Sequence, residues 1–125
     1  NSAYHCGGLM AVYAAIQRIA LKDVNAGVVE RFYASAIQSP ALVIGQLSKL
    51  CNHHLDKFEN KTLARDYKDK LAELACAVGT DIPVTLSLEQ QSYFALGYYQ
   101  MGARLAREKN EAISASKQKN NRNEE

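Results

Sequence analysis

The sequence predicts an all-α protein, a compact helical bundle of about five helices with a disordered C-terminal tail. Three observations lead to this prediction. Apolar residues recur at steps of three and four, which is the helical period, and no segment alternates with the period of a strand. Residues that begin and end helices separate the periodic segments. The chain has 125 residues, of which 47% are hydrophobic, and this is enough for one domain with an ordinary core.

The first helix is expected from about Ala3 to Leu21. Its apolar positions are Leu9, Val12, Ile16 and Ile19. Gly7 and Gly8 weaken its first turns, and two adjacent glycines there indicate either fraying or the close approach of another backbone.

Asn25 is a good N-cap for a second helix that ends near Gln38. Its apolar positions are Val28, Phe32 and Ala36. Ser39 followed by Pro40 predicts the start of a third helix, because serine caps a backbone N–H and proline suits the first helical position. The third helix should run to about Phe58. Its apolar face consists of Val43, Leu47, Leu50, Cys51, Leu55 and Phe58, with His54 among them.

A fourth helix is expected after the polar break at Glu59 and Asn60, and Gly79 is a natural residue to end it. Its apolar positions are Leu63, Tyr67, Leu71, Leu74 and Val78. The last helix opens near Ser87, which has capping-box spacing to Gln90. The buried stripe of this helix consists of Phe94, Tyr98, Met101 and Leu105.

The chain divides into a helical bundle domain, residues 1–110, and a polar tail, residues 111–125. Apolar residues nearly vanish beyond about Arg107. From Ser114 onward there is almost nothing to bury, so we expect this tail to be disordered.

Composition limits the possible environments and partners. The chain has no apolar run long enough to span a bilayer and no secretory signal at its start, so we expect a soluble, cytoplasmic protein that does not enter a membrane. A net charge of +2 does not by itself indicate nucleic-acid binding, so the distribution of the basic residues must decide. The three cysteines are widely spaced and include no C-x-x-C pair, so we expect free, mostly buried thiols.

Cys51, His53 and His54 are the residues closest to a metal or nucleophile motif. On a helix, Cys51 and His53 point about 200° apart, and the other such pair in the sequence, His5 and Cys6, is remote. We therefore expect structural roles: a hydrogen-bonded His54 on a mostly apolar face, and a His53 that contacts solvent or a partner. No metal site is predicted.

Other catalytic motifs are missing from the sequence. It has neither the glycine-rich phosphate loop of nucleotide hydrolases nor a dinucleotide-binding fingerprint. Ser39 and Ser87 are better explained as helix caps than as nucleophiles. Asp66, Asp69 and Glu73 lie along one side of a helix and are interpreted as a solvated face. We therefore predict no catalytic residues, no cofactor and no enzymatic activity.

The basic residues form three ridges at helical spacing. The first ridge lies on the third helix, opposite its apolar stripe, and consists of Gln46, Lys49, His53 and Lys57. The second ridge lies on the fourth helix and consists of Lys61, Arg65 and Lys68. The third ridge lies on the last helix and consists of Gln100, Arg104 and Arg107. Such ridges are often only solvated faces, but they also suit binding to a phosphate backbone.

Three ordered blocks of the sequence resemble the C-terminal domain of the large subunit of the type I-C CRISPR Cascade complex. The first block is Asn1-Ser2-Ala3-Tyr4 with Gly7, Leu9, Ala11-Val12 and Ile16-Gln17. The second is Asn25, Val28, Arg31-Phe32-Tyr33, Ala36, Pro40, Leu47, Leu50 and His53-His54. The third is Pro83, Leu86-Ser87-Leu88-Glu89, Gln91 and Phe94-Ala95-Leu96-Gly97-Tyr98-Tyr99. Two positions depart from the family pattern, since Gly8 replaces an arginine and Gln100-Met101 replaces His-Gln.

A chain of this length that matches only this terminal domain resembles the separate small subunit of the type I-C complex, which in that family is translated from an internal start in the large-subunit gene. The resemblance implies a non-catalytic role in RNA-guided antiviral defence, in which the small subunit bridges subunits and helps to hold the opened DNA of the R-loop. The implied partners are the large subunit, the backbone subunits, another copy of the same chain, and guide RNA or target DNA, in particular the displaced single strand.

A displaced single strand needs a cationic surface that is tolerant of sequence, because the guide RNA reads the bases. The candidate nucleic-acid-binding residues, chosen by helix face, are Arg31, Lys49, Lys57, Lys61, Arg65, Lys68, Arg104 and Arg107. The alternative is a purely structural adaptor, whose same faces meet acidic protein surfaces and never contact nucleic acid.

Overall fold

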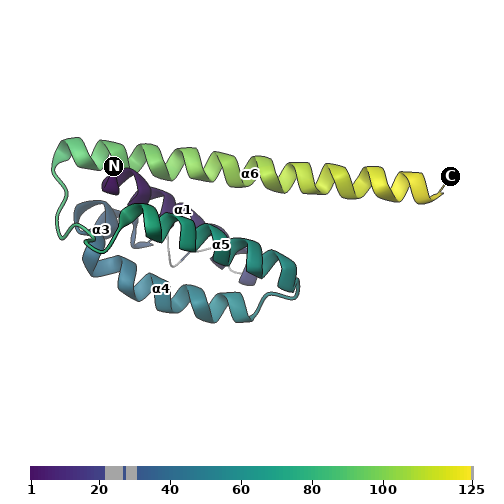
Figure 1. Ribbon diagram of the computed structural model, residues 1–125, viewed down its shortest axis with the longest axis horizontal. Helices are drawn as coiled ribbons and strands as arrows, with labels where there is room; N and C mark the ends of the chain where they lie inside the picture. Colours follow the sequence, from purple (N-terminus) through teal and green to yellow (C-terminus); the bar gives the residue numbers. More distant parts are fainter. Residues whose placement is uncertain (22–26, 28–30, 125) are drawn as a thin grey trace.

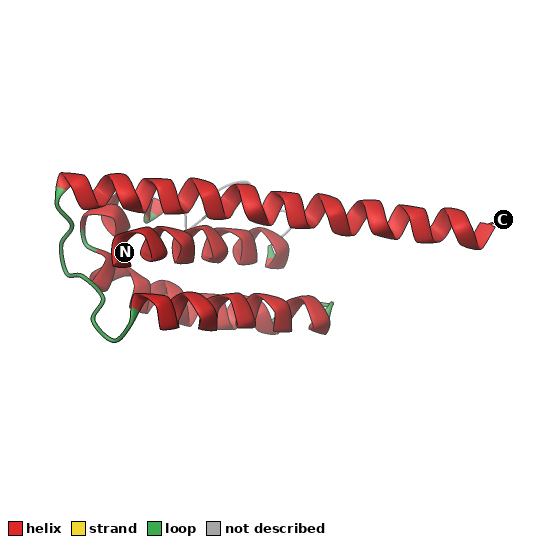
Figure 2. Ribbon diagram, turned by 45° about the horizontal axis from the view of Figure 1, so that its top comes forward, coloured by secondary structure: helices red, strands yellow, loops and turns green. Residues whose placement is uncertain are grey.

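The computed structural model describes residues 1–21, 27 and 31–124, and the side chains up to residue 118. This part of the chain contains five helices and no strand, so the all-α prediction is confirmed (Figures 1 and 2). The helices are α1 (Ser2–Ala20), α3 (Tyr33–Gln38), α4 (Pro40–Asp56), α5 (Lys61–Val78) and α6 (Leu88–Glu124). The N-cap predicted at Asn25 and the apolar position Val28 lie outside the described residues.

Helix α1 is the centre of the bundle. Every residue from Cys6 to Gln17 is buried, because α4, α5 and α6 all pack along this helix. A helix that is largely apolar on all sides requires such neighbours. Helices α4 and α6 run in the same direction as α1, whereas α5 runs in the opposite direction (Figure 1). The short α3 packs against α4 and α6.

Two glycines allow α1 and α6 to touch through their backbones. A Cβ atom at Gly7 would lie 2.0 Å from the carbonyl oxygen of Phe94, and a Cβ atom at Gly97 would lie 2.0 Å from the carbonyl oxygen of Tyr4. Real Cβ atoms do not come so close, so neither position accepts any side chain. The sequence left fraying and backbone approach open at Gly7, and the structure shows backbone approach.

Most of the predicted helix ends are confirmed. Ser87 and Gln90 form the capping box, since the Gln90 N–H donates to Ser87 Oγ at 3.2 Å and the Ser87 N–H donates to Gln90 Oε1 at 2.9 Å. Gly79 ends α5 with a φ of 84°, which favours glycine. Asn60, predicted only as a polar break, caps α5 by accepting a hydrogen bond from the Leu63 N–H at 3.0 Å. Ser39 is the N-cap residue of α4 and Pro40 occupies the first helical position, as predicted, but the Ser39 side chain does not make the predicted capping hydrogen bond.

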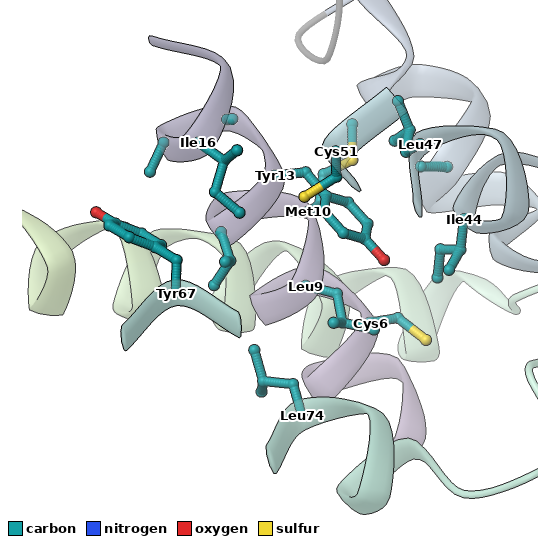
Figure 3. Close-up of a cluster of buried hydrophobic side chains, with 14 of the residues drawn as sticks. Cys6, Leu9, Met10, Tyr13, Ile16, Ile44, Leu47, Cys51, Tyr67 and Leu74 are labelled. Atoms are coloured by element: carbon teal, nitrogen blue, oxygen red, sulfur yellow. The ribbon is translucent and has the colours of Figure 1, made fainter. Parts of the chain in front are cut away.

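The core gathers side chains of α4 and α5 around α1 (Figure 3), and α6 adds Phe94 and Leu105. Phe94, an expected anchor of α6, has an exposed fraction of 0%. Tyr33 of α3 packs edge to face on Phe94 and Tyr98, with ring centroids 5.7 Å and 4.8 Å apart. Because Tyr33 and Tyr98 are only partly buried, this aromatic cluster forms the edge of the core.

The segment from residue 111 has the exposure that its composition predicts but a different form. Residues 111–118 are all exposed, and the structure continues α6 through them to Glu124, past the rest of the bundle (Figure 2). The sequence predicts a disordered tail because it offers no apolar face. However, the chain has no proline or glycine after Gly102, and the alanine, lysine, glutamine and glutamate residues of the tail have good helix propensity. The tail therefore continues the helix although it has no apolar face.

Candidate functional site

The first ridge lies on the outer side of α4 and ends at Lys57, the residue that follows the helix. Lys49, His53 and Lys57 are all exposed, as a binding or solvated face requires. Ser48 and Asn52 of α4 line the groove toward α5, and positions on a helix advance by about 100° per residue. Lys49 and His53 therefore point away from that groove.

The second ridge lies on the side of α5 that faces α4. Lys68 lines a groove of about 380 Å³ between the two helices, whose floor includes Leu9 and Tyr13 of α1. Lys61 and Arg65 precede Lys68 by two turns and one turn on the same side of α5. The Lys61 ammonium donates to the carbonyl oxygen of Asp56 at 3.3 Å, which ties the start of α5 to the end of α4.

The third ridge borders a different groove, between α5 and α6. Arg104 and Arg107 line this groove of about 620 Å³, together with Tyr4 and His5 of α1. Both arginines are exposed. Arg104 donates to Glu108 at 3.1 Å, so its charge is partly compensated within α6.

The acidic line of α5 separates the second ridge from the third. Asp66, Asp69 and Glu73 are exposed, as predicted for a solvated face. Lys70 links α5 to α6, because its ammonium lies 3.0 Å from Asp66 of α5 and 3.2 Å from Glu108 of α6. Burial tends to lower the pKa of Lys70, but hydrogen bonds to the two carboxylates raise it above its ordinary value, so this lysine remains charged.

The eight candidate basic residues are exposed, but they do not form one continuous surface. Lys49 lies on the outer side of α4, whereas Lys57 follows the end of α4 and lines a groove with Ile19 of α1 and Leu63 of α5. Lys61, Arg65 and Lys68 follow the groove between α4 and α5. Arg104 and Arg107 border the groove between α5 and α6, and Arg31 precedes α3.

Two of the three cysteine side chains, Cys6 and Cys51, are buried in the core. Burial raises the pKa of the Cys6 thiol to about 11 and that of the Cys51 thiol to about 12, so both stay protonated and poorly nucleophilic. Cys76, in contrast, is exposed. No cluster of three or more metal-ligating side chains occurs in the part of the chain that the structure describes.

His54 differs from its prediction in one respect. Its ring is buried, with an exposed fraction of 5%, as expected for its position on the apolar face of α4. Neither ring nitrogen has a hydrogen-bond partner among the described residues, so the predicted hydrogen bond is wrong. Desolvation lowers the pKa of His54, and the charges of Lys57 and His53 lower it further, so the ring is neutral at pH 7.

An apolar surface on α6 was missed at the sequence level. Leu88, Leu96 and Tyr99 have exposed fractions of 83%, 47% and 72%. Their steps of eight and three residues place them near one side of α6, away from the stripe that contains Phe94 and Leu105. This second apolar spacing within one helix was visible in the sequence and could have indicated a contact surface for another protein.

Helices long and apolar enough to cross a membrane do not occur among the described residues. In a comparison with known protein families, the family model described as CRISPR-associated protein (Cas_Csd1) matches residues 1–105. No curated protein sequence matches the chain.

Proposed function

Because this chain belongs to the Cas_Csd1 family of CRISPR-associated proteins, we propose that it is the non-catalytic small subunit of a type I-C surveillance complex. The family match carries this proposal. It covers residues 1–105 and so includes α1, α3, α4, α5 and the whole buried part of α6, whose last buried residue is Leu105. The resemblance of its ordered sequence blocks to the terminal domain of the type I-C large subunit supports the specific assignment.

In this role the chain bridges neighbouring subunits and stabilises the R-loop through its basic helix faces. The second ridge is the best candidate for the nucleic-acid contact, because Lys61, Arg65 and Lys68 are exposed and follow one edge of a groove. Arg65 and Lys68 have no ion-pair partner among the described residues, so their charges are available to phosphates. Such contacts add affinity without reading bases, which suits a complex whose guide RNA supplies the sequence specificity.

A purely structural adaptor is the second candidate, and the apolar surface of α6 favours it. Leu88, Leu96 and Tyr99 are suited to a protein contact, whereas a phosphate backbone offers them little. The two functions are compatible if α6 meets a neighbouring subunit while α5 meets the nucleic acid. They differ in whether the second ridge contributes to target binding.

The test is the triple substitution Lys61→Ala, Arg65→Ala and Lys68→Ala in the assembled complex. Folding and assembly should be nearly unchanged, because these side chains lie outside the core. Target-DNA binding should weaken with little change in sequence preference, and the salt dependence should lose a slope of about 2, since each single-strand phosphate contact accounts for about 0.7.

Lys109→Ala with Lys117→Ala is the control, because it removes exposed cations from the far part of α6. Target affinity and salt slope that are unchanged in the triple variant would make the second ridge a solvated face. Failure of assembly in the triple variant would instead assign the ridge to a protein interface, and the adaptor function would then be preferred.

A further inference from the structure

The groove between α5 and α6 has the composition of a binding site and contributes nothing to the proposed contact along the second ridge. Its volume of about 620 Å³ lies within the range of small-molecule sites. Three helices line it, with Gly8 of α1 and Gly97 of α6 among the residues. Both glycines are buried, because the α1 backbone at Tyr4 lies against Gly97 and the Leu74 side chain lies against Gly8, so they form the closed base of the groove.

Part of the groove is lined by apolar and aromatic side chains. Leu74 of α5 and Met101 of α6 flank Gly8, because a Cβ atom there would lie 3.3 Å from a methyl group of Leu74 and 3.9 Å from the methyl group of Met101. Tyr4 and His5 add two aromatic rings, which pack edge to face with centroids 5.5 Å apart. Aromatic and apolar side chains of this kind stack on nucleobases of any sequence.

Polar groups of both charges line the same groove. The Tyr4 hydroxyl donates to Gln100 Oε1, which leaves the Gln100 amide nitrogen as a donor. Glu73 offers a carboxylate that can accept from an exocyclic amino group. Arg104 and Arg107 supply the positive charge for a phosphate, and Arg107 has no ion-pair partner among the described residues.

We infer that this groove accepts one unstacked nucleotide of a single strand, with the base in the apolar part and its phosphate at Arg104 and Arg107. The inference rests on the proposed function, because it adds a base-binding site to a protein that is proposed to contact a single strand. A nucleotide combines a flat apolar face, a polar edge and an adjacent negative charge, and the groove offers a partner for each. An acidic peptide helix would fit less well, because Glu73 lies in the lining beside the arginines.

The experiment compares two probes of equal length and charge on the full chain: a short deoxycytidine oligomer and an abasic oligomer. Binding is followed by fluorescence anisotropy at low salt. The parent protein should bind the deoxycytidine oligomer about fivefold more tightly or better, since stacking of even one base gives this much. Both oligomers should show the same salt slope, because they present the same phosphates.

Ala77→Trp fills the groove from the exposed side of α5, and Cys76→Trp is the matched control. Cys76 is exposed and adjacent, but it points about 100° around the helix and does not line the groove. The preference for the oligomer with bases should disappear in Ala77→Trp and persist in Cys76→Trp, and thermal melting should confirm that both variants are folded.

Four results would overturn the inference. Equal affinity of the parent for the two oligomers would mean that only phosphates are bound, and an undiminished preference in Ala77→Trp would place the bases elsewhere; both leave the proposed function standing. Binding of neither oligomer by the folded parent would also overturn it, while the target-binding test of the second ridge in the assembled complex decides the proposed function separately. An acidic peptide that binds the parent but not Ala77→Trp, and that no oligomer displaces, would assign the groove to a protein partner.

Discussion

Single residues determine how closely the two principal helices meet. Gly7 and Gly97 allow the backbones of α1 and α6 to touch, so the absence of a side chain at these positions is a packing requirement. Gly102, also on α6, has nothing within 4 Å of the place where a Cβ atom would stand. The same amino acid therefore has opposite mutational consequences at two positions of one helix.

Gly97→Ala should lower the free energy of unfolding by about 3 kcal/mol or more, because a Cβ atom 2.0 Å from a backbone carbonyl oxygen forces the helices apart. Gly102→Ala should stabilise the protein by about 0.5–1 kcal/mol, the gain expected when alanine replaces glycine inside a helix. Urea unfolding of both variants measures the two effects. Equal stability of the two variants would show that the close approach is not required.

His54 makes stability depend on pH. Its pKa is lowered in the folded state, so below its ordinary value of about 6.5 the unfolded chain binds a proton that the folded chain resists. Above pH 6.5 His54 is neutral in both states and costs no stability through protonation. As the pH falls from 6.5 toward the lower pKa of the folded state, the free energy of unfolding decreases.

His54→Leu should remove this acid sensitivity and raise stability at pH 7, because it removes two buried nitrogens that have no partner. The measurement is urea unfolding at pH 7.5 and pH 5. His53→Gln is the comparison variant: the His53 charge is the smallest cause of the lowered His54 pKa, so its loss should reduce the pH dependence only in part. Identical pH dependence in the parent and in His54→Leu would assign acid sensitivity to other groups.

At the scale of the element, α6 consists of a part that packs against the bundle and a part that is exposed on all sides. Its first half carries the stripe with Phe94 and Leu105 that packs against α1. Residues 111–118 have no buried face, so local propensity and α6's continuity with the packed half maintain their helical form. The two halves should differ in how much they contribute to the stability of the bundle.

Removal of residues 111–125 should leave the melting temperature of the bundle nearly unchanged, because residues 111–118 are exposed throughout. The helical signal in circular dichroism should fall by the share that these residues contribute. A large drop in melting temperature would mean that the far half of α6 stabilises the bundle through contacts.

At the scale of the whole molecule, the sequence predicts the elements better than their arrangement. Periodicity and capping signals such as Ser87 with Gln90 are local, so they predict the helices and most of their described ends, although α6 continues beyond the predicted boundary to Glu124. Which helices become neighbours depends on shapes such as the backbone approach at Gly97, and no local pattern contains that information.

For the candidate site, the sequence likewise predicts which side chains are exposed but not how they are arranged. The exposure of the basic ridges follows from helix angle, and all eight residues are exposed. Their separation onto different grooves requires the positions of α4, α5 and α6 around α1, so Lys68 and Arg104 could not be assigned to different sites in advance. His54 shows another limit, because a residue pattern indicates burial but not whether a hydrogen-bond partner is present.

The central position of α1 also affects how the protein is made. Helix α1 ends at Ala20 and its main neighbour α6 begins at Leu88, so the ribosome completes the centre of the bundle long before the helix that covers it. At about 5–20 residues per second, the nascent chain carries an apolar α1 without its α6 contacts for about 3–14 seconds. During that time α1 is available to chaperones or to the same segment of another nascent chain, and the bundle can close only when α6 has left the exit tunnel.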